Sequence, residues 1–377
     1  MTKDIEGYRI SPQQSQVFLR QRGFFRPLLA QCVIRLDGFV DLSTLRDAIS
    51  TVISRHGILR TRFVRPTASK LPLQVISDES RFDWRVIDPA TFSNQGGDIS
   101  GIDDFKRLGR ALMEQEREVS FDLAGGATLH AAALPLTDQS CLLALSMPAV
   151  CADTLTLHNL FREIGTAYVN RADESAEPVQ YLQFSEWQNE VLEDDEAFIG
   201  KEYWQQQQTG RAHNVTLPFA APTRHADASE AESQSPVQRA STTVALNTRV
   251  AELAQRLQCS EDVVLLSCWQ VLLSRLTGES AVTTTHVHNG RKYEELADAF
   301  GLFARSLPLG VTFDEGMTFA ALAQNVNERV TEGGQWQEYF VPDELALGRC
   351  YGGGIGYEYE LRPQSFAGPD VRLEIVA

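Results

Sequence analysis

Three side chains that could do chemistry stand close together near the middle of the chain: Cys151, Asp153 and His158. A cysteine thiolate can accept an acyl group, and a neutral imidazole can accept a proton near pH 7. Each also has a simpler interpretation. Cysteine is often a small buried side chain, no histidine stands at an offset that indicates an activated thiol, and a histidine on an amphipathic helix often serves packing. The sequence leaves a catalytic and a structural role open for Cys151 and His158.

These side chains follow two apolar runs, residues 129–134 and 141–147, which a polar turn separates. The pattern predicts a pair of strands. Pro148 cannot donate to a strand ladder and restricts the residue before it, so we expect the chain to leave the sheet there and to begin a helix near Asp153. A loop between a strand and a helix is a common position for reactive groups.

A second set of candidates, His286 and His288, lies two residues apart on a predicted strand over residues 281–287. With a carboxylate, two such histidines could bind a metal ion, but no third ligand stands at a suitable spacing. We therefore predict no metal site and interpret the pair as lining a cleft or facing solvent.

The same order of elements recurs in both halves of the chain. In the first half, Asp41 caps a predicted helix over residues 42–53, and strands are expected before and after it. In the second half, Ser260 caps an apolar helix that Gly278 ends. This recurrence indicates two α/β lobes, which we place at residues 1–175 and 176–377.

Composition excludes several classes of protein. No apolar run approaches the roughly 20 residues that span a bilayer, and the N-terminus lacks the apolar core of a signal peptide, so we expect a cytoplasmic protein. The six cysteines form no C-x-x-C pair and are expected to be reduced thiols. With 50 acidic and 34 basic residues, the formal net charge of −16 disfavours binding to nucleic acid or to anionic membranes.

Several longer motifs carry a resemblance to a known family. They are Ser11-Pro-Gln-Gln with Phe18-Leu19, Arg55-His-Gly-Ile-Leu-Arg-Thr-Arg-Phe63, Tyr181-Leu-Gln-Phe-Ser-Glu-Trp187 with Tyr203-Trp204, Leu272-Leu-Ser-Arg-Leu-Thr-Gly278, Gly290-Arg291 and Phe300-Gly-Leu-Phe303 with Leu307-Pro-Leu309. Through them the chain resembles the condensation-domain superfamily of nonribosomal peptide synthetases, relatives of chloramphenicol acetyltransferase. The resemblance implies an α/β fold, an α+β sandwich of two chloramphenicol acetyltransferase-like lobes in a V-shaped pseudo-dimer. It also implies that the second lobe is incomplete at its C-terminus, because the resembling domains continue further.

The resemblance assigns roles to the residues around Asp153. The family's His-His-x-x-x-Asp-Gly motif, aligned on Asp153, places Pro148 and Ala149 at the histidine positions and Thr154 at the glycine. Neither replacement has a titratable side chain. The family's structural arginine corresponds to Arg60, which implies an Asp153–Arg60 ion pair, and Arg55 belongs to the same structural motif. By the same resemblance, Ala149, Thr154, His286 and His288 would line the substrate tunnel.

The expected function is a condensation-like domain that binds intermediates on the phosphopantetheine arms of donor and acceptor carrier proteins, next to other synthetase domains and with no cofactor of its own. Three alternatives stay open. In the first, histidine-assisted amide formation is impaired. In the second, an altered acyl transfer or cyclization proceeds because the domain positions the two substrates. In the third, the domain is a non-catalytic platform that recruits a tailoring enzyme. The heterocyclization motif Asp-x-x-x-x-Asp is matched only at its second aspartate, Asp153.

Overall fold

The computed structural model describes residues 7–21, 28–67, 69–95, 102–170, 177–209, 217–218, 247–341, 355–363 and 365–377. The chain divides into two compact units. Unit 1 comprises residues 1–189, 293–303 and 360–377, and unit 2 comprises residues 190–292 and 304–359. Among the described residues, no helix is both long and apolar enough to cross a bilayer.

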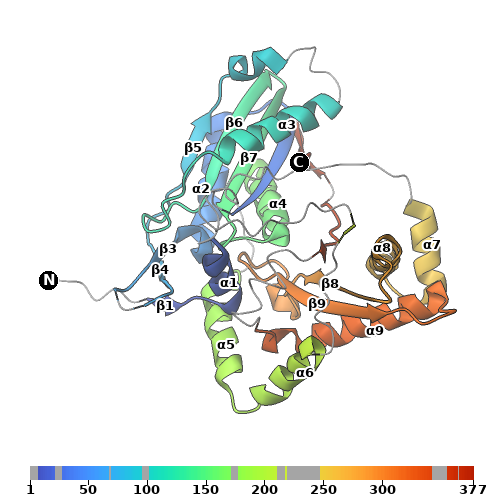
Figure 1. The fold of residues 1–377 in the computed structure, drawn as a ribbon. Coiled ribbons are helices and arrows are strands. Elements are labelled where there is room, and N and C mark those ends of the chain that lie inside the picture. The colour runs from blue at the N-terminus through green and yellow to red at the C-terminus, as the bar shows by residue number, and fades with distance from the viewer. Residues whose placement is uncertain are drawn as a thin grey trace. The chain divides into compact units, whose positions relative to one another are not determined.

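Unit 1 is built on a six-stranded mixed sheet with the strand order β11-β12-β2-β7-β6-β5 (Figure 1). A smaller antiparallel sheet has the order β1-β4-β3. The strands are β1 (Tyr8–Arg9), β2 (Leu29–Gly38), β3 (Thr61–Val64), β4 (Leu73–Ile76), β5 (Asp83–Val86), β6 (His130–Thr137), β7 (Ser140–Pro148), β11 (Phe366–Ala367) and β12 (Val371–Ile375). The helices are α1 (Pro12–Gln21), α2 (Leu42–Arg55), α3 (Ile102–Glu116), α4 (Thr154–Asn170) and α5 (Tyr181–Glu193), with short 3₁₀ turns η1 (Gly57–Arg60), η2 (Pro89–Gln95) and η4 (Glu294–Leu296).

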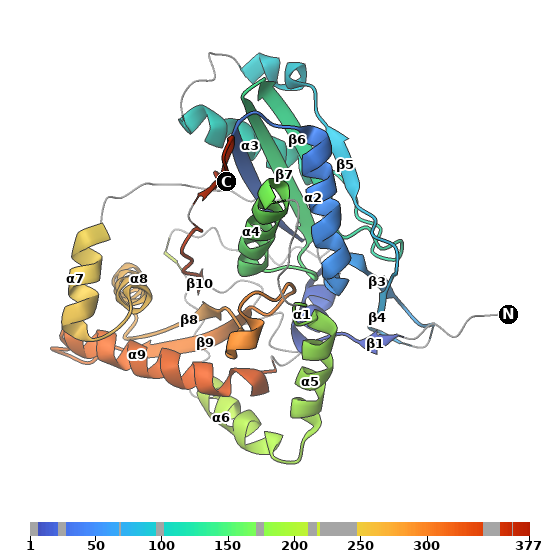
Figure 2. The same ribbon diagram turned by 180° about the vertical axis from the view of Figure 1, so that it is seen from behind.

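The neighbouring strands β6 and β7 are buried on both faces along most of their length. Helices α2 and α4 cover one face of the large sheet and α3 covers the other, as Figure 2 shows from behind. Because both faces are covered, these strands are almost continuously apolar rather than alternating, which explains why they could be recognised in the sequence. The predicted strand pair is therefore confirmed.

The predicted helix after Asp41 is also confirmed. The Asp41 side chain accepts a hydrogen bond from the Ser43 backbone N–H, and α2 follows it directly. The end of the chain takes a place that we did not predict. Residues 360–377, which we had placed in the second lobe, belong to unit 1, where β12 pairs antiparallel with β2.

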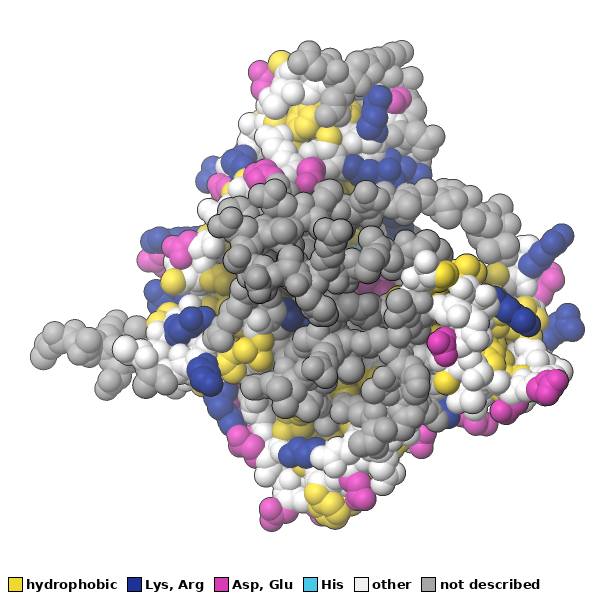
Figure 3. All heavy atoms as spheres, viewed as in Figure 1, with side chains coloured by type: hydrophobic (Ala, Val, Ile, Leu, Met, Phe, Trp, Pro, Cys, Tyr) yellow, Lys and Arg dark blue, Asp and Glu magenta, His cyan; other side chains and the backbone are white. Residues whose placement is uncertain are grey.

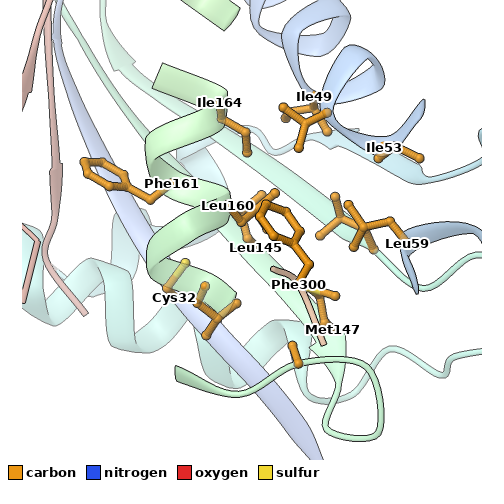
Figure 4. Packing of buried hydrophobic residues seen from close by; sticks show 14 of the residues in the cluster. Cys32, Ile49, Ile53, Leu59, Leu145, Met147, Leu160, Phe161, Ile164 and Phe300 are labelled. Atoms are coloured by element: carbon orange, nitrogen blue, oxygen red, sulfur yellow. The ribbon is translucent and has the colours of Figure 1, made fainter. Parts of the chain in front are cut away.

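One segment from late in the chain, residues 293–303, also belongs to unit 1. Its Phe300 is 1% exposed, and Figure 4 shows the ring among Leu59, Leu145 and Leu160. The imidazole of His56 stacks on this ring with 3.6 Å between centroids and an interplanar angle of 8°. The segment is thus part of the apolar core of unit 1.

Unit 2 contains a three-stranded sheet of order β10-β8-β9. Its strands are β8 (Ala281–His288), β9 (Arg305–Thr312) and β10 (Gly356–Tyr357), and its helices are α6 (Ala197–Thr209), α7 (Asn247–Leu257), α8 (Glu261–Thr277), α9 (Phe319–Trp336) and the 3₁₀ turn η5 (Gln337–Tyr339). The predicted boundaries of α8 are confirmed: the Ser260 hydroxyl accepts from the Val263 N–H, and Gly278 ends the helix with a φ of 75°. Residues 219–240 of the predicted connection lie outside the described residues.

We predict that His56→Leu lowers the free energy of unfolding of the protein by about 1–3 kcal/mol. The His56 imidazole is 2% exposed, and its Nε2 lies 3.0 and 2.9 Å from the two carboxylate oxygens of Glu163. Leucine keeps most of the volume but leaves the carboxylate without this donor and removes the ring stacked on Phe300.

Urea denaturation of the full chain measures this effect. Thr51→Ala, an exposed position on α2, is the control and should change stability little. An unfolding free energy for His56→Leu equal to that of the wild type would contradict the assigned packing role.

Candidate functional site

The loop from Ala149 to Asp153 is held at its start by two backbone hydrogen bonds. Pro148 is the last residue of β7 and stands opposite Leu29 on β2. The Ala149 N–H donates to the Leu28 carbonyl at 2.8 Å, and the Cys151 N–H donates to the Pro148 carbonyl at 2.8 Å. The chain therefore leaves the sheet after the proline in one defined turn, as the sequence predicted.

Asp153 caps the first turn of α4. Its Oδ1 accepts a hydrogen bond from the Thr156 N–H at 2.8 Å, the usual bond of an N-cap to the third helical residue. Its Oδ2 accepts from the Phe303 N–H at 2.9 Å. The residue is 7% exposed, so these bonds replace water around a buried carboxylate.

Thr156 continues this connection to the segment 293–303. Its hydroxyl lies 2.7 Å from both Asp153 Oδ1 and the Gly301 carbonyl oxygen, and it accepts from the Gly301 N–H at 3.0 Å. A side chain at Gly301, whose φ is 148°, would overlap the ring of Tyr181. The Tyr181 hydroxyl in turn donates to the Leu302 carbonyl at 2.8 Å. Glycine is required here because two segments of the chain approach closely.

The expected Asp153–Arg60 ion pair is not present within the described part of the chain, and this expectation is corrected. The Arg60 guanidinium Nη1 instead donates to the Ser77 carbonyl at 2.5 Å. The Asp153 carboxylate accepts instead from the Thr156 N–H, three positions away, and from the Phe303 N–H, 150 positions away. Arg55 pairs with Glu163, with 3.7 Å between Nη1 and Oε2.

The three chemical candidates on the loop and helix differ in exposure. Cys151 is 0% exposed, and burial raises the pKa of its thiol. His158 is half-buried, and its pKa is lowered first by burial and then by the positive charge of Arg362. Ala149 and Thr154 are half-buried as well. The thiol is therefore protonated and inaccessible, whereas the imidazole is neutral and partly accessible.

In unit 2 the two predicted histidines lie together with a carboxylate that the sequence analysis missed. Nδ1 of His286 lies 3.1 Å from Nε2 of His288, and Nε2 of His286 lies 3.2 Å from Oδ2 of Asp262. Asp262 stands in the first turn of α8, 24 residues before His286, so only the packing of α8 on β8 brings them together. No group of three His, Cys, Asp or Glu side chains suited to a metal ion occurs among the described residues.

Other residues of unit 1 were also missed, notably Thr156 and Gly301. The spacing Asp153-x-x-Thr156 is a helix-start signal that could have indicated the first contact. The contact with Gly301 joins positions 145 residues apart, which no local pattern reveals.

The sequence and the structure were compared with known proteins. The family model of the condensation domain matches residues 8–341. Phosphinothricin tripeptide synthetase PhsC of Streptomyces viridochromogenes is 29% identical over 310 residues, which cover 79% of this chain and 27% of that protein. The chain thus spans about a quarter of the length of this curated relative. Malpinin synthetase of Mortierella alpina is 24% identical over 324 residues, which cover 83% of this chain and 4% of that protein.

A solved structure shows the same fold. The starter condensation domain of rhizomide synthetase has a TM-score of 0.78 at 16% identity, covering 98% of this chain and 82% of that chain. The mixed α/β fold expected from the resemblance is therefore confirmed. With its two sheet-and-helix units and a family match over residues 8–341, this chain belongs to the condensation-domain family.

Proposed function

We propose that this chain is a condensation-like domain of a nonribosomal peptide or hybrid polyketide assembly line, in which standard histidine-assisted amide formation is impaired or replaced. One observation carries the proposal: the last residue of β7 is Pro148 and the loop after it begins with Ala149, at the two positions where the family motif has histidines. Neither side chain can accept a proton or a hydrogen bond.

The remaining groups of the loop do not replace the missing base. Both oxygens of Asp153 accept hydrogen bonds from neighbouring N–H groups, so its role is to hold the loop and the segment 293–303. The protonated, buried thiol of Cys151 is a poor nucleophile because the thiolate is the reactive form. His158, the third candidate, is half-buried and so keeps some exposure. We assign any residual proton transfer to its imidazole.

The substrates we propose are acyl or aminoacyl groups on the phosphopantetheine arms of donor and acceptor carrier proteins. The adjacent synthetase domains are further proposed partners. Ala149 and Thr154, both half-buried, would contact such an arm. Figure 3 shows acidic and basic side chains interspersed on the described residues of one face, so a carrier protein would dock through local charge pairs rather than a single basic field.

A second candidate function is a non-catalytic platform that recruits a tailoring enzyme. The X-domain of teicoplanin biosynthesis, solved as a complex with OxyB, has a TM-score of 0.71 at 20% identity and covers all of this chain and 81% of that chain. This likeness shows a common fold, and its relevance here rests on the lack of histidine at both motif positions.

We predict that carrier proteins loaded with donor and acceptor substrates bind this chain. Transfer of the acyl group from donor to acceptor should be about 10²–10⁴-fold slower than on a relative that has the two histidines, because that factor is the usual contribution of a general base. Intact-protein mass spectrometry of both carriers measures the transfer. Transfer at the rate of the relative would overturn the proposal that amide formation is impaired. Residual transfer that His158→Phe abolishes would identify an altered reaction in which His158 transfers the proton. Binding of the loaded carriers without any transfer would support the function of a non-catalytic platform.

We predict that Asp153→Ala lowers the free energy of unfolding by about 1–3 kcal/mol, because the N–H groups of Thr156 and Phe303 both lose their acceptor. Asp153→Asn keeps an accepting oxygen and should lose less. Denaturant titrations of the full chain compare the two variants, and equal unfolding energies for Asp153→Ala and the wild type would exclude the capping role.

We predict that iodoacetamide modifies the exposed Cys268 in the native protein but modifies Cys151 only after unfolding. Peptide mass spectrometry after timed labelling reads both sites in one sample, so Cys268 serves as the internal control. Rapid native labelling of Cys151, or an acyl adduct on it after incubation with loaded carriers, would restore the nucleophile hypothesis.

A further inference from the structure

Unit 1 contains a cavity of about 480 Å³ that shares no residue with the loop from Ala149 to Asp153. Three segments line it: Arg62 on β3, the end of β4 with the residues that follow it, and the pair Gly125 and Gly126. Its volume lies within the usual range of pockets that bind small molecules, about 300–1,000 Å³. The cavity is therefore large enough to hold a small ligand.

Two walls of this cavity are fixed by main-chain contacts with β3 and η1. On one side, the Ser77 N–H donates to the Arg60 carbonyl at 2.9 Å, and Nη1 of Arg60 donates to the Ser77 carbonyl at 2.5 Å. On the other side, the Phe63 N–H donates to the Leu123 carbonyl at 2.8 Å. These bonds hold both walls without the help of a ligand.

The Arg62 side chain lies against the loop that carries the two glycines. A Cβ atom added to Gly126, whose φ is 91°, would come within 2.6 Å of Cγ of Arg62. The alkyl stem of the arginine thus packs closely on a position that favours glycine. Because this contact restrains the stem, a ligand that binds the guanidinium orders less of the side chain.

The Arg62 guanidinium has no partner within the described part of the chain. Its Nε is buried without an acceptor, and the side chain makes neither a hydrogen bond nor an ion pair there. Arg60 and Arg305 also have a buried Nε without an acceptor, but their Nη1 atoms donate to the carbonyls of Ser77 and Gln337. A buried donor without an acceptor destabilises a protein. A ligand with a carboxylate would supply the missing acceptor.

The other charged residues of the lining leave one carboxylate over. Arg81 pairs with Glu79, with 2.5 Å between Nη2 and Oε2, so these two charges offset each other. Asp78 is exposed and makes no hydrogen bond or ion pair in the described part of the chain. A simple anion at Arg62 would be repelled by Asp78, and a simple cation at Asp78 would be repelled by Arg62. A ligand that carries both charges satisfies both residues.

We propose that this cavity binds a small zwitterion, a free α-amino acid, whose carboxylate accepts from the Arg62 guanidinium and whose ammonium group pairs with Asp78. The flat fork of guanidinium donors matches a carboxylate. Ile76, the apolar side chain of the lining, would contact the side chain of the amino acid. This ligand is free in solution, so the site goes beyond the carrier-bound substrates of the proposed function.

The first test compares three small probes that differ only in charge. L-Alanine carries both groups, propionate lacks the ammonium group, and ethylamine lacks the carboxylate. Saturation-transfer NMR on the full chain should show L-alanine binding, with propionate and ethylamine each about tenfold weaker because one charge-assisted hydrogen bond is lost. Binding of propionate or ethylamine as strong as that of L-alanine, or no binding of L-alanine, would reject the site.

The second test removes each charge from the protein. Arg62→Met keeps the stem that packs on Gly126, and Asp78→Asn keeps the shape of the side chain. Each should weaken L-alanine binding about tenfold. The matched controls are Arg65→Met and Asp138→Asn, at exposed positions outside the lining, which should bind as the wild type does. Equal losses in the variants and their controls would overturn the proposal, since they would indicate a general effect of charge.

A third measurement separates the binding role of Arg62 from a role in folding. Because its guanidinium has no partner in the described part of the chain, Arg62→Met should unfold at the same urea concentration as the wild type, or at a higher one. A lower midpoint would show that the guanidinium serves the fold and would count against the site. None of these outcomes depends on transfer between loaded carriers, which tests the proposed function separately.

Discussion

The arrangement of unit 1 depends on the contact between the start of α4 and the segment 293–303. Asp153 accepts from Phe303, and Thr156 exchanges hydrogen bonds with Gly301. These bonds satisfy a buried carboxylate and backbone groups that would otherwise be left without water, which costs about 1–3 kcal/mol each. Since Phe300 lies in the same segment, the polar contact also sets the position of an aromatic ring at the centre of the core.

This constraint gives Asp153 a structural task that does not depend on the residues at positions 148 and 149. The carboxylate of Asp153 serves the N-terminus of a helix and a distant backbone N–H, and neither task involves proton transfer. A histidine four or five residues earlier, at position 149 or 148, would contribute to neither bond. Under the proposed alignment of Pro148 and Ala149 with the motif histidines, the structural task of Asp153 is physically separable from proton transfer.

How far the sequence could be interpreted follows from the range of each interaction. Local signals such as Asp41, Ser260 and Gly278 predicted helix ends correctly, because a cap involves residues only a few positions apart. The assignment of Arg60 to Asp153 failed because it concerned a contact across 93 positions, which packing decides. The same reason hid Asp262 from the analysis of the two histidines and hid the pairing of β12 with β2.

The two polar clusters differ in what they leave available for chemistry. At the start of α4 both carboxylate oxygens accept hydrogen bonds and the nearby thiol is buried, so that cluster has no group in a reactive state. In unit 2 His286 stands between Asp262, at 3.2 Å, and His288, at 3.1 Å, and burial lowers the pKa of His288 to about 3, so that this imidazole stays neutral. A fully hydrogen-bonded polar network makes a fold rigid. A neutral imidazole can still accept a hydrogen bond, whereas the buried thiol is held in its unreactive, protonated form.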